Sequence, residues 1–305
     1  MNNIKQRTIT GVVYVLAVIC AIIFSPYITI GFFGAVAMIA LWEFYHNLKE
    51  INIHPNYIMG YAIAILFYLL FVLFRFIIGK KDSFIADTDV YDLIAIYAII
   101  GVAFLFLLVF ITFLVEIFRK KENPFSNIAY TLLGIVYIVL PMGLLNSLNV
   151  GKESSAICGI ANFTPHILMG IFIIAWTNDT FAYLVGMKFG KHKFCERISP
   201  KKTWEGFLGG LLFSLIAGFC IAIFVNWGQT IQVLCMRICF WIGMALIISI
   251  IGTMGDLVES MFKRQLGIKD SGNILPGHGG MLDRFDIIFM IVPFVAIYLM
   301  ITVLI

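Results

Sequence analysis

Apolar runs long enough to cross a lipid bilayer recur along the whole of this 305-residue chain. A transmembrane helix needs about 20 mostly apolar residues, because the hydrocarbon layer is about 30 Å thick. The backbone finds no hydrogen-bond partner in lipid, so such runs fold as helices. The predicted spans are 8–25, 27–44, 57–79, 92–117, 128–149, 165–186, 206–226, 232–261 and 284–304. The sequence therefore predicts an all-α, polytopic integral membrane protein with about nine transmembrane helices.

Composition and local signals agree with this prediction. Hydrophobic residues make up 61% of the chain and charged residues only 12%, which is too apolar for a soluble core of this size. The Ser25-Pro26 pair predicts a tight hairpin between the first two spans, and Pro141 predicts a kink in the fifth. The first run lacks a small-residue cleavage site, so we expect it to be retained as a helix. The six cysteines form no C-x-x-C pair, so we expect free thiols.

Lys and Arg residues are unevenly distributed among the connections between the predicted spans. With the N-terminus inside, most of the 21 fall on the inner side. The predicted outer side keeps Arg75, Lys80, Lys81, Lys152 and Arg237. Cytoplasmic loops carry the excess of basic residues, so this pattern predicts a cytoplasmic N-terminus and an outer C-terminus.

Unusual polar residues gather in the second half of the chain. Residues 1–160 read as scaffold helices with ordinary basic loops, and residues 161–305 read as a catalytic region with basic and glycine-rich loops. No linker or repeat separates the two, so we expect one continuous membrane domain.

Acidic and amide side chains lie within or beside three of the last four spans. They are Asn178 and Asp179, Asp256 and Glu259, and Asp283 and Asp286. An Asp at mid-helix raises the free energy of insertion by roughly 2.5–3.5 kcal/mol, and neighbouring carboxylates repel unless a cation offsets them. Oxygen ligands without His or Cys favour Mg²⁺. We expect metal ligands among Asp179, Asp256, Asp283 and Asp286, with interhelical hydrogen bonds or helix N-terminal carboxylates as the alternative.

The connection between the last two spans reads KRQLGIKDSGNILPGHGGMLDRFD, from Lys263 to Asp286. Its glycines, Gly277, Gly279 and Gly280, would let backbone N–H groups approach an anion closely. His278 could bond a phosphate oxygen or assist proton transfer, although a lone loop histidine is more often a surface residue.

A second basic connection, KFGKHKFCERISPKKTWEG, follows the sixth span. Its first lysines could simply anchor the loop to anionic lipid. Ser199, Lys201, Lys202 and Thr203 precede a helix expected to begin near Glu205, and its positive end favours a triphosphate there. The glycines at 206, 209 and 210 suggest close helix packing.

Residues 260–286 resemble the signature of the phosphatidate cytidylyltransferases, and the resemblance covers about residues 170–290. It rests on Lys263-Arg264, Lys269-Asp270, Gly272, Pro276, His278-Gly279-Gly280, Asp283-Arg284 and Asp286. The short link NWGQT between the seventh and eighth spans is similar to the bacterial branch. The resemblance implies an enzyme of the inner membrane that joins CTP to phosphatidic acid, giving CDP-diacylglycerol and pyrophosphate. It also implies a polar cavity that is open to the cytoplasm. The implied partners are the membrane lipids and a second copy of the chain in a homodimer, and no nucleic acid.

The resemblance and the residue chemistry together assign roles. Asp256 and Asp283 would hold Mg²⁺, with or without a second, monovalent cation. The expected catalytic residues are Asp256, Asp283, Lys263, Arg264 and His278. The expected substrate-binding residues are Asn178, Asp179, Ser199, Lys201, Lys202, Thr203, Lys269, Gly279, Gly280 and Arg284. Two alternatives remain: a CTP-dependent transferase acting on another lipid phosphate, and an ion-coupled transporter, which would show matching polar residues in both halves.

Overall fold

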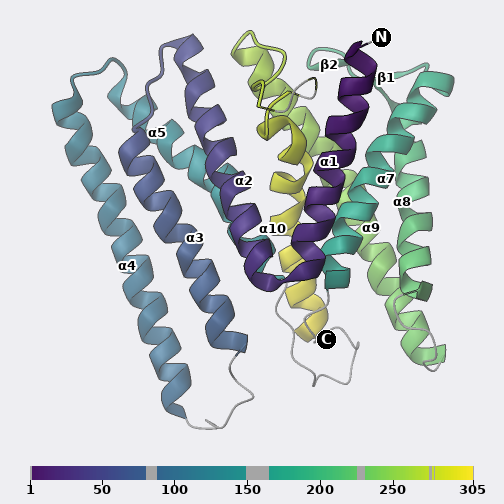
Figure 1. Ribbon diagram of the computed structural model, residues 1–305, viewed down its shortest axis with the longest axis horizontal. Coiled ribbons are helices and arrows are strands. Elements are labelled where there is room, and N and C mark those ends of the chain that lie inside the picture. The colour runs from purple at the N-terminus through teal and green to yellow at the C-terminus, as the bar shows by residue number, and fades with distance from the viewer. Residues whose placement is uncertain are drawn as a thin grey trace. The chain divides into compact units, whose positions relative to one another are not determined.

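The computed structural model describes residues 2–79, 88–148, 165–224, 231–274, 277 and 279–304, and these residues are almost entirely helical (Figure 1). The first helices are α1 (Asn2–Phe24), α2 (Pro26–Asn47), the 3₁₀ turn η1 (Leu48–Ile51), α3 (Tyr57–Gly79), α4 (Thr88–Arg119), α5 (Pro124–Gly134), η2 (Ile135–Val139) and α6 (Leu140–Ser147). The rest are α7 (Pro165–Phe189), β1 (Lys193–Cys195), β2 (Ser199–Thr203), α8 (Trp204–Phe224), α9 (Ile231–Gln265) and α10 (Leu282–Leu304). The all-α class is confirmed.

Seven helices in the described part of the chain are long and apolar enough to cross a membrane. They are Tyr27–Ile51, Ile99–Arg119, Pro124–Ser147, Ile167–Phe189, Trp204–Phe224, Leu234–Gln265 and Leu282–Thr302. Two shorter apolar helices, Thr8–Phe24 and Tyr57–Leu73, coincide with the predicted first and third spans. A multi-pass membrane protein is therefore confirmed, whereas the count of nine crossings stays a prediction.

Contacts divide the chain into two compact units, and each is described by itself. The first unit comprises Met1–Val150 and Leu266–Arg284, and the second comprises Gly151–Gln265 and Phe285–Ile305. The boundary falls inside α10, whose first turn therefore belongs to the first unit. The predicted division into a scaffold and a catalytic region is one of chemistry and stays a prediction.

The first unit begins with the predicted hairpin. Helix α1 ends at Phe24, and the Ser25 hydroxyl accepts a hydrogen bond from the Tyr27 N–H at 3.2 Å, which caps α2. Pro26 occupies the first turn of α2. N–H groups in a first turn have no partner within the helix, so the missing N–H of proline costs no helical hydrogen bond there. The core of the unit contains Phe33, Leu41, Tyr45, Ile138 and Met142, all fully buried.

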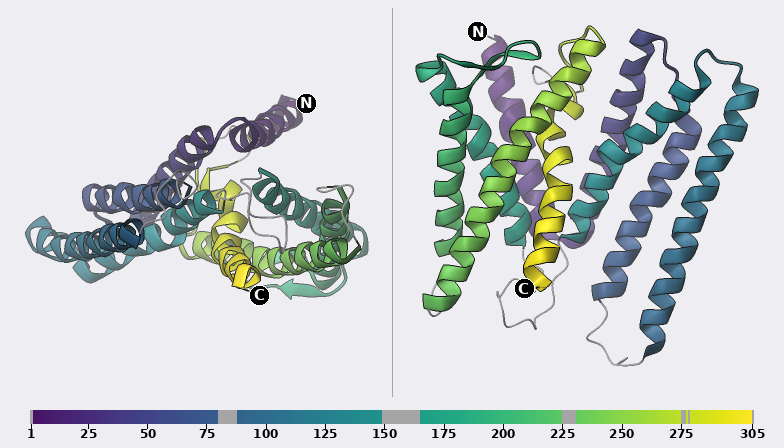
Figure 2. Two further views of the ribbon diagram at one scale, coloured as in Figure 1. Left: turned by 90° about the horizontal axis from the view of Figure 1, so that it is seen from below. Right: turned by 180° about the vertical axis from the view of Figure 1, so that it is seen from behind.

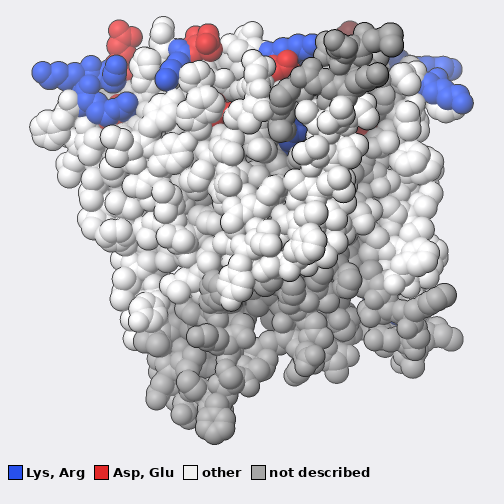
Figure 3. All heavy atoms as spheres, in the orientation of Figure 1, with Lys and Arg blue, Asp and Glu red and all other residues white. Residues whose placement is uncertain are grey.

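Three polar connections of the first unit meet at one end of its helices. Arg119 donates to the His54 carbonyl at 3.1 Å, so the end of α4 contacts the connection before α3. Asn47 donates to the Ser271 carbonyl at 2.7 Å, which brings the glycine-rich connection to the end of α2. Basic side chains gather where α4 ends and α5 begins (Figure 3), at Arg119, Lys120 and Lys121 in the sequence. The side of the membrane that this end of the helices faces stays a prediction.

The fifth span is interrupted, as its proline predicts. A π-helical turn, η2, separates α5 from α6, and Pro141 lies in the first turn of α6. The course of the chain from α5 to α6 can be followed in the right-hand view of Figure 2. A proline ring clashes with the carbonyl four residues earlier and offers no N–H, so a wider turn before it relieves the clash. The irregularity therefore begins a full turn before the proline itself.

Glycines hold α7 and α8 close together in the second unit. A Cβ atom at Gly209 would lie 2.6–2.7 Å from the side-chain carbons of Val185, and one at Gly206 would lie 2.7 Å from the Ala182 carbonyl. The rings of Phe181 and Phe213 stack with centroids 3.6 Å apart. The expectation that these glycines serve helix packing is confirmed.

A short antiparallel hairpin, β1 and β2, joins α7 to α8, and the sequence analysis did not predict it. Lys193 pairs with Thr203 and Cys195 with Ser199, with an irregular register between them. The Trp204 N–H donates to the His192 carbonyl at 3.0 Å, which leads the hairpin directly into α8. The two strands contain three basic residues and a proline, so they lack the alternation of apolar and polar residues that is typical of a strand. Five cysteines in the described residues are free thiols, as expected.

Candidate active site

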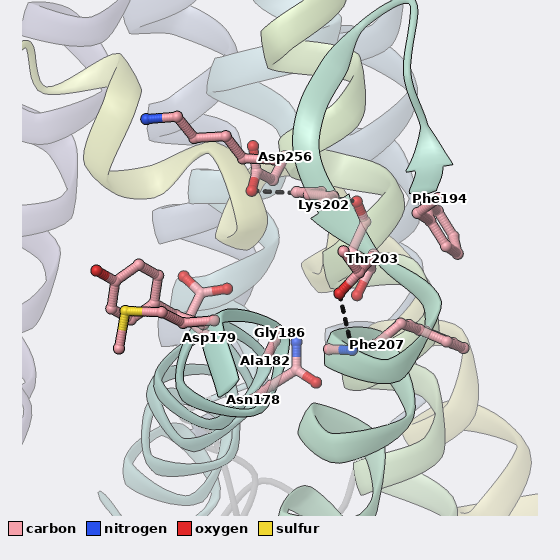
Figure 4. Close-up of a pocket in the computed structure, with 14 residues that line it drawn as sticks. Asn178, Asp179, Ala182, Gly186, Phe194, Lys202, Thr203, Phe207 and Asp256 are labelled. Atoms are coloured by element: carbon pink, nitrogen blue, oxygen red, sulfur yellow. Dashed lines mark hydrogen bonds and ion pairs between the residues drawn. The ribbon is translucent and has the colours of Figure 1, made fainter. Parts of the chain in front are cut away.

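A cavity of about 520 Å³ lies within the second unit, between α7, the hairpin, α8 and α9 (Figure 4). It brings together several side chains that the sequence assigned to substrate or metal. Its lining includes Asn178, Asp179, Lys201, Lys202, Thr203 and Asp256. Residues separated by almost 80 positions in the sequence thus line one cavity.

An ion pair joins β2 to α9 at this cavity. The Lys202 ammonium lies 2.7 Å from Asp256 Oδ2 and donates to the Thr253 carbonyl at 3.3 Å. The Ser260 hydroxyl donates to Asp256 Oδ1 at 3.2 Å. Both charged side chains remain partly accessible, at 24% and 32% of their surface. A polyanionic ligand entering the cavity can therefore reach the ammonium group.

Helix α7 places an amide and a carboxylate side by side. Asn178 is buried, and its Oδ1 accepts from the Ser214 hydroxyl at 3.5 Å, whereas Asp179 is exposed. Figure 4 shows both residues on α7, facing the cavity that Lys202 and Asp256 also line. The predicted placement of Asn178 and Asp179 at the substrate space is consistent with this geometry.

Three carboxylates from α9 and α10 converge in the second unit. One oxygen from each of Asp256, Glu259 and Asp286 lies within 4.8 Å of the others. Glu259 and Asp286 are buried, and Glu259 pairs with Lys263 at 2.5 Å. Carboxylates this close together repel one another unless a cation offsets their charge. Because all three would offer oxygen atoms, the cluster fits a hard divalent cation. The trio contains two of the predicted ligands, Asp256 and Asp286, together with Glu259 of the same predicted acidic group.

Other predicted residues take positions that the sequence did not indicate. The Thr203 hydroxyl accepts from the Gly206 N–H at 3.2 Å, so it caps α8 as well as lining the cavity. Ser199 begins β2 and Arg264 lies exposed in the last turn of α9, and neither lines this cavity. Lys263 forms an ion pair with Glu259.

The remaining predicted residues belong to the glycine-rich connection, which is part of the first unit. Asp283 Oδ2 accepts from the Ser271 N–H at 2.8 Å, the Ser271 hydroxyl at 2.9 Å and the Gly280 N–H at 2.8 Å. Gly279 has a φ of 82°, and a Cβ atom there would lie 2.6 Å from Asp283 Oδ2. Gly279 thus makes room for the Asp283 carboxylate, and Gly280 donates a backbone hydrogen bond to it.

Three further members of the predicted set belong to the same connection. Lys269 is exposed and Arg284 is half-buried. His278 lies outside the described residues. The binding of phosphate by this connection stays a prediction.

Sequence reasoning missed a buried glutamate in the first unit. Glu43, on α2, is 1% exposed and accepts from the Met281 N–H at 2.9 Å, the Leu282 N–H at 2.7 Å and the Ser271 hydroxyl at 3.3 Å. The signal was available, because an ionisable residue near the end of an apolar span is unfavourable unless it has a partner or a function.

Comparison with known proteins places the chain in a family. The sequence model of the cytidylyltransferase family matches residues 5–302. The phosphatidate cytidylyltransferase of Staphylococcus aureus strain COL is 39% identical over 190 residues, which cover 62% of this chain and 66% of that protein. Enzymes of the same name from Staphylococcus saprophyticus and Haemophilus influenzae are 33% and 30% identical, over 97% and 95% of this chain and 98% and 96% of their own lengths. The chain belongs to the cytidylyltransferase family.

Proposed function

We propose that this protein transfers the cytidylyl group of CTP to phosphatidic acid, giving CDP-diacylglycerol and pyrophosphate. The observation that carries the proposal is the cavity between α7, β2, α8 and α9, where lysines and carboxylates meet within a membrane-embedded unit. The phosphatidate cytidylyltransferases compared above, which share about a third of their residues with this chain over almost its full length, support the same activity.

The main requirement of this reaction is that the protein brings two polyanions, CTP and phosphatidic acid, close together. A phosphate oxygen of phosphatidic acid attacks the α-phosphorus of CTP, and the bond from that phosphorus to the β,γ-diphosphate breaks, releasing pyrophosphate. Because the attacking oxygen is already an anion, little general-base catalysis is needed. Charge stabilisation by fixed cations then dominates, as in other phosphoryl transfers.

Lysines at the cavity supply part of that charge. Lys202 lines the space and is held by Asp256 and the Thr253 carbonyl, and Lys201 lies exposed on the same strand. We assign both to the phosphates of CTP. Asn178 and Asp179 lie on the opposite wall and are assigned to substrate orientation. The alternative role for the lysines, anchoring the loop to anionic lipid, predicts unchanged dependence on CTP when they are replaced.

The carboxylates fit a divalent ion, and we propose Mg²⁺. When bound, it would neutralise charge on the phosphates of the nucleotide. We assign Asp256 and Asp283 as its ligands, with Asp179, Asp286 and Glu259 available to assist. The convergence of Asp256, Glu259 and Asp286 within 4.8 Å supports the assignment in the second unit. Asp283 is assigned by its resemblance to the family signature.

Apolar walls beside the charged groups suit a lipid substrate. Tyr183 and Met187 line the cavity and are each 67% exposed, and Phe194 and Phe207 line it too. The phosphate headgroup can thus meet the lysines while the acyl chains remain in the bilayer. By resemblance to the family, we also propose that the protein works as a homodimer in a bacterial inner membrane, with its N-terminus and active site cytoplasmic.

One assay tests the activity. Purified protein is incubated with CTP labelled on the cytidine, Mg²⁺ and, in separate tubes, phosphatidic acid, an isoprenoid phosphate or diacylglycerol, and the lipid products are separated by chromatography. We expect labelled CDP-diacylglycerol with phosphatidic acid alone. A labelled product formed only with another lipid would show that phosphatidic acid is not the substrate. Solute flux in liposomes without CTP consumption would show that the protein is a transporter and not a transferase.

A further inference from the structure

Glu43 and Asp283, two acidic residues from distant parts of the sequence, hold the same short turn of the first unit. We propose that Glu43 is a positioning residue that fixes Asp283 in the orientation needed to bind the divalent cation. The proposal rests on the proposed function only in taking Asp283 as a metal ligand. It gives a role to a residue outside the segment that resembles the family signature.

The contacts of Glu43 fix the start of α10. The Met281 and Leu282 N–H groups donate to its two carboxylate oxygens at 2.9 and 2.7 Å. N–H groups at the start of a helix have no partner within the helix, and the helix dipole favours a negative charge there. Glu43 therefore replaces the local capping residue with a carboxylate supplied by α2, which ties the turn to a second helix.

Ser271 connects the two carboxylates. Its hydroxyl lies 3.3 Å from Glu43 Oε2 and 2.9 Å from Asp283 Oδ2, and its N–H donates to Asp283 at 2.8 Å. A hydroxyl carries one proton, so the two acidic groups share it. Three donors on one oxygen of Asp283 fix the rotation of that carboxylate. Glu43 contacts the Ser271 hydroxyl and also the N–H groups of Met281 and Leu282, directly before Asp283 in the chain. It therefore fixes both a hydrogen-bond donor to Asp283 and the backbone that carries this residue.

The glycines of this turn fit around Glu43. A Cβ atom would lie 2.6 Å from Glu43 Oε1 at Gly272 and 2.5 Å from Glu43 Oε2 at Gly280. Either distance is too short for a side chain, so a glycine is needed at both positions while Glu43 stays in place. Gly280, one of the glycines that suggested a phosphate loop, therefore also has a packing reason, which is its contact with this buried carboxylate.

Groups that orient a metal ligand affect the metal measurably. Replacing such a partner typically lowers metal affinity by about 10- to 100-fold, even though it never touches the ion. A helix cap with no further role lowers only stability, by about 0.5–2 kcal/mol. Metal affinity in the folded protein therefore separates the two roles.

Glu116 offers a matched control in the same unit. It is also buried, and its carboxylate accepts from Asn127 at 2.8 Å and from Arg119 at 2.6 Å. These partners lie at the end of α4 and the start of α5, and none belongs to the glycine-rich connection. Glu116→Gln thus removes an equally buried charge without touching Asp283.

The experiment compares Glu43→Gln and Glu116→Gln in the full-length protein in detergent. Binding of Mn²⁺, used as the probe for the divalent ion, is followed by electron paramagnetic resonance without substrate, together with thermal unfolding. We expect Glu43→Gln to weaken Mn²⁺ binding at least about tenfold and Glu116→Gln to change it less than about twofold. Mn²⁺ affinity within about twofold of wild type in folded Glu43→Gln would reduce Glu43 to a helix cap and overturn the proposal.

A second variant covers the case in which Glu43→Gln does not fold. Ser271→Ala removes only the shared hydroxyl, and we expect it to weaken Mn²⁺ binding as well; unchanged affinity would again overturn the proposal. The assay of the wild type separates the two hypotheses. Wild-type protein that makes no CDP-diacylglycerol while Glu43→Gln still weakens Mn²⁺ binding would remove the proposed function and keep this inference. Active wild-type protein together with unchanged Mn²⁺ binding in Glu43→Gln would keep the proposed function and remove this inference.

Discussion

Replacing Asp256 with Asn should separate the catalytic role of this residue from its structural one. The substitution keeps the shape of the side chain and removes the charge that faces Lys202 at 2.7 Å. Because the two side chains keep 24% and 32% of their surface accessible, water partly screens their ion pair, which stabilises the fold by about 1 kcal/mol. The Ser260 hydroxyl can still donate to the remaining amide oxygen. The free energy of unfolding should therefore change little.

The effect on turnover should be far larger. A preorganised charged group that stabilises a transition state is typically worth about 10²–10³ in rate, or roughly 3–4 kcal/mol. We expect Asp256→Asn to lower the formation of CDP-diacylglycerol by at least about 100-fold at saturating CTP and Mg²⁺. The measurement is the initial rate with labelled CTP, beside a thermal unfolding curve of the same preparation.

Ser260→Ala is the matched control, because it removes a partner of Asp256 without changing the charge. It should keep at least about a tenth of the wild-type rate, since a hydrogen bond of this kind contributes roughly 1 kcal/mol. Turnover of Asp256→Asn above about a tenth of wild type would refute the assignment. A fall in stability large enough to explain the lost rate would equally refute the reasoning.

Three further predictions follow from other parts of the second unit and from the ion. Lys201→Ala combined with Lys202→Ala should raise the KM for CTP more than that for phosphatidic acid, as measured by initial rates; equal KM values with altered membrane topology would favour lipid anchoring. Gly209→Val should lower stability by about 1–3 kcal/mol, because its side chain would overlap Val185, and a thermal unfolding curve unchanged from wild type would show that α7 and α8 can separate. Chelation with EDTA should abolish turnover and added Mg²⁺ should restore it, whereas activity that survives chelation would remove the metal from the reaction.

The sequence predicted the helices well because a single physical constraint determines them. Lipid forces the backbone to bond within each span, so apolar length alone locates a helix. Ser25 and Pro26 marked the first hairpin, and the described bounds of α7 and α8 fall within a few residues of the predicted spans. Asn178, Asp179 and Asp256, which line the cavity, were singled out because polar residues in an apolar run need a reason to be there.

Features that depend on tertiary contacts were missed. The β1–β2 hairpin has no strand-like alternation and is held by its junction with α8 through the Trp204 N–H. Glu43 lay in a part of the chain that was interpreted as scaffold, and its partners are more than 220 residues away in the sequence. The capping role of Thr203 likewise appears only when α8 is in place.

An experimental structure with Mg²⁺ and a non-hydrolysable CTP analogue tests the central claim most directly, namely that the cavity of the second unit binds the nucleotide phosphates and that Asp256 binds the ion beside them. We expect an ion at about 2.1 Å from an oxygen of Asp256, the usual distance for Mg²⁺, with nucleotide phosphates near Lys202. Nucleotide bound away from Lys202, or an ion that does not contact Asp256, would contradict the claim.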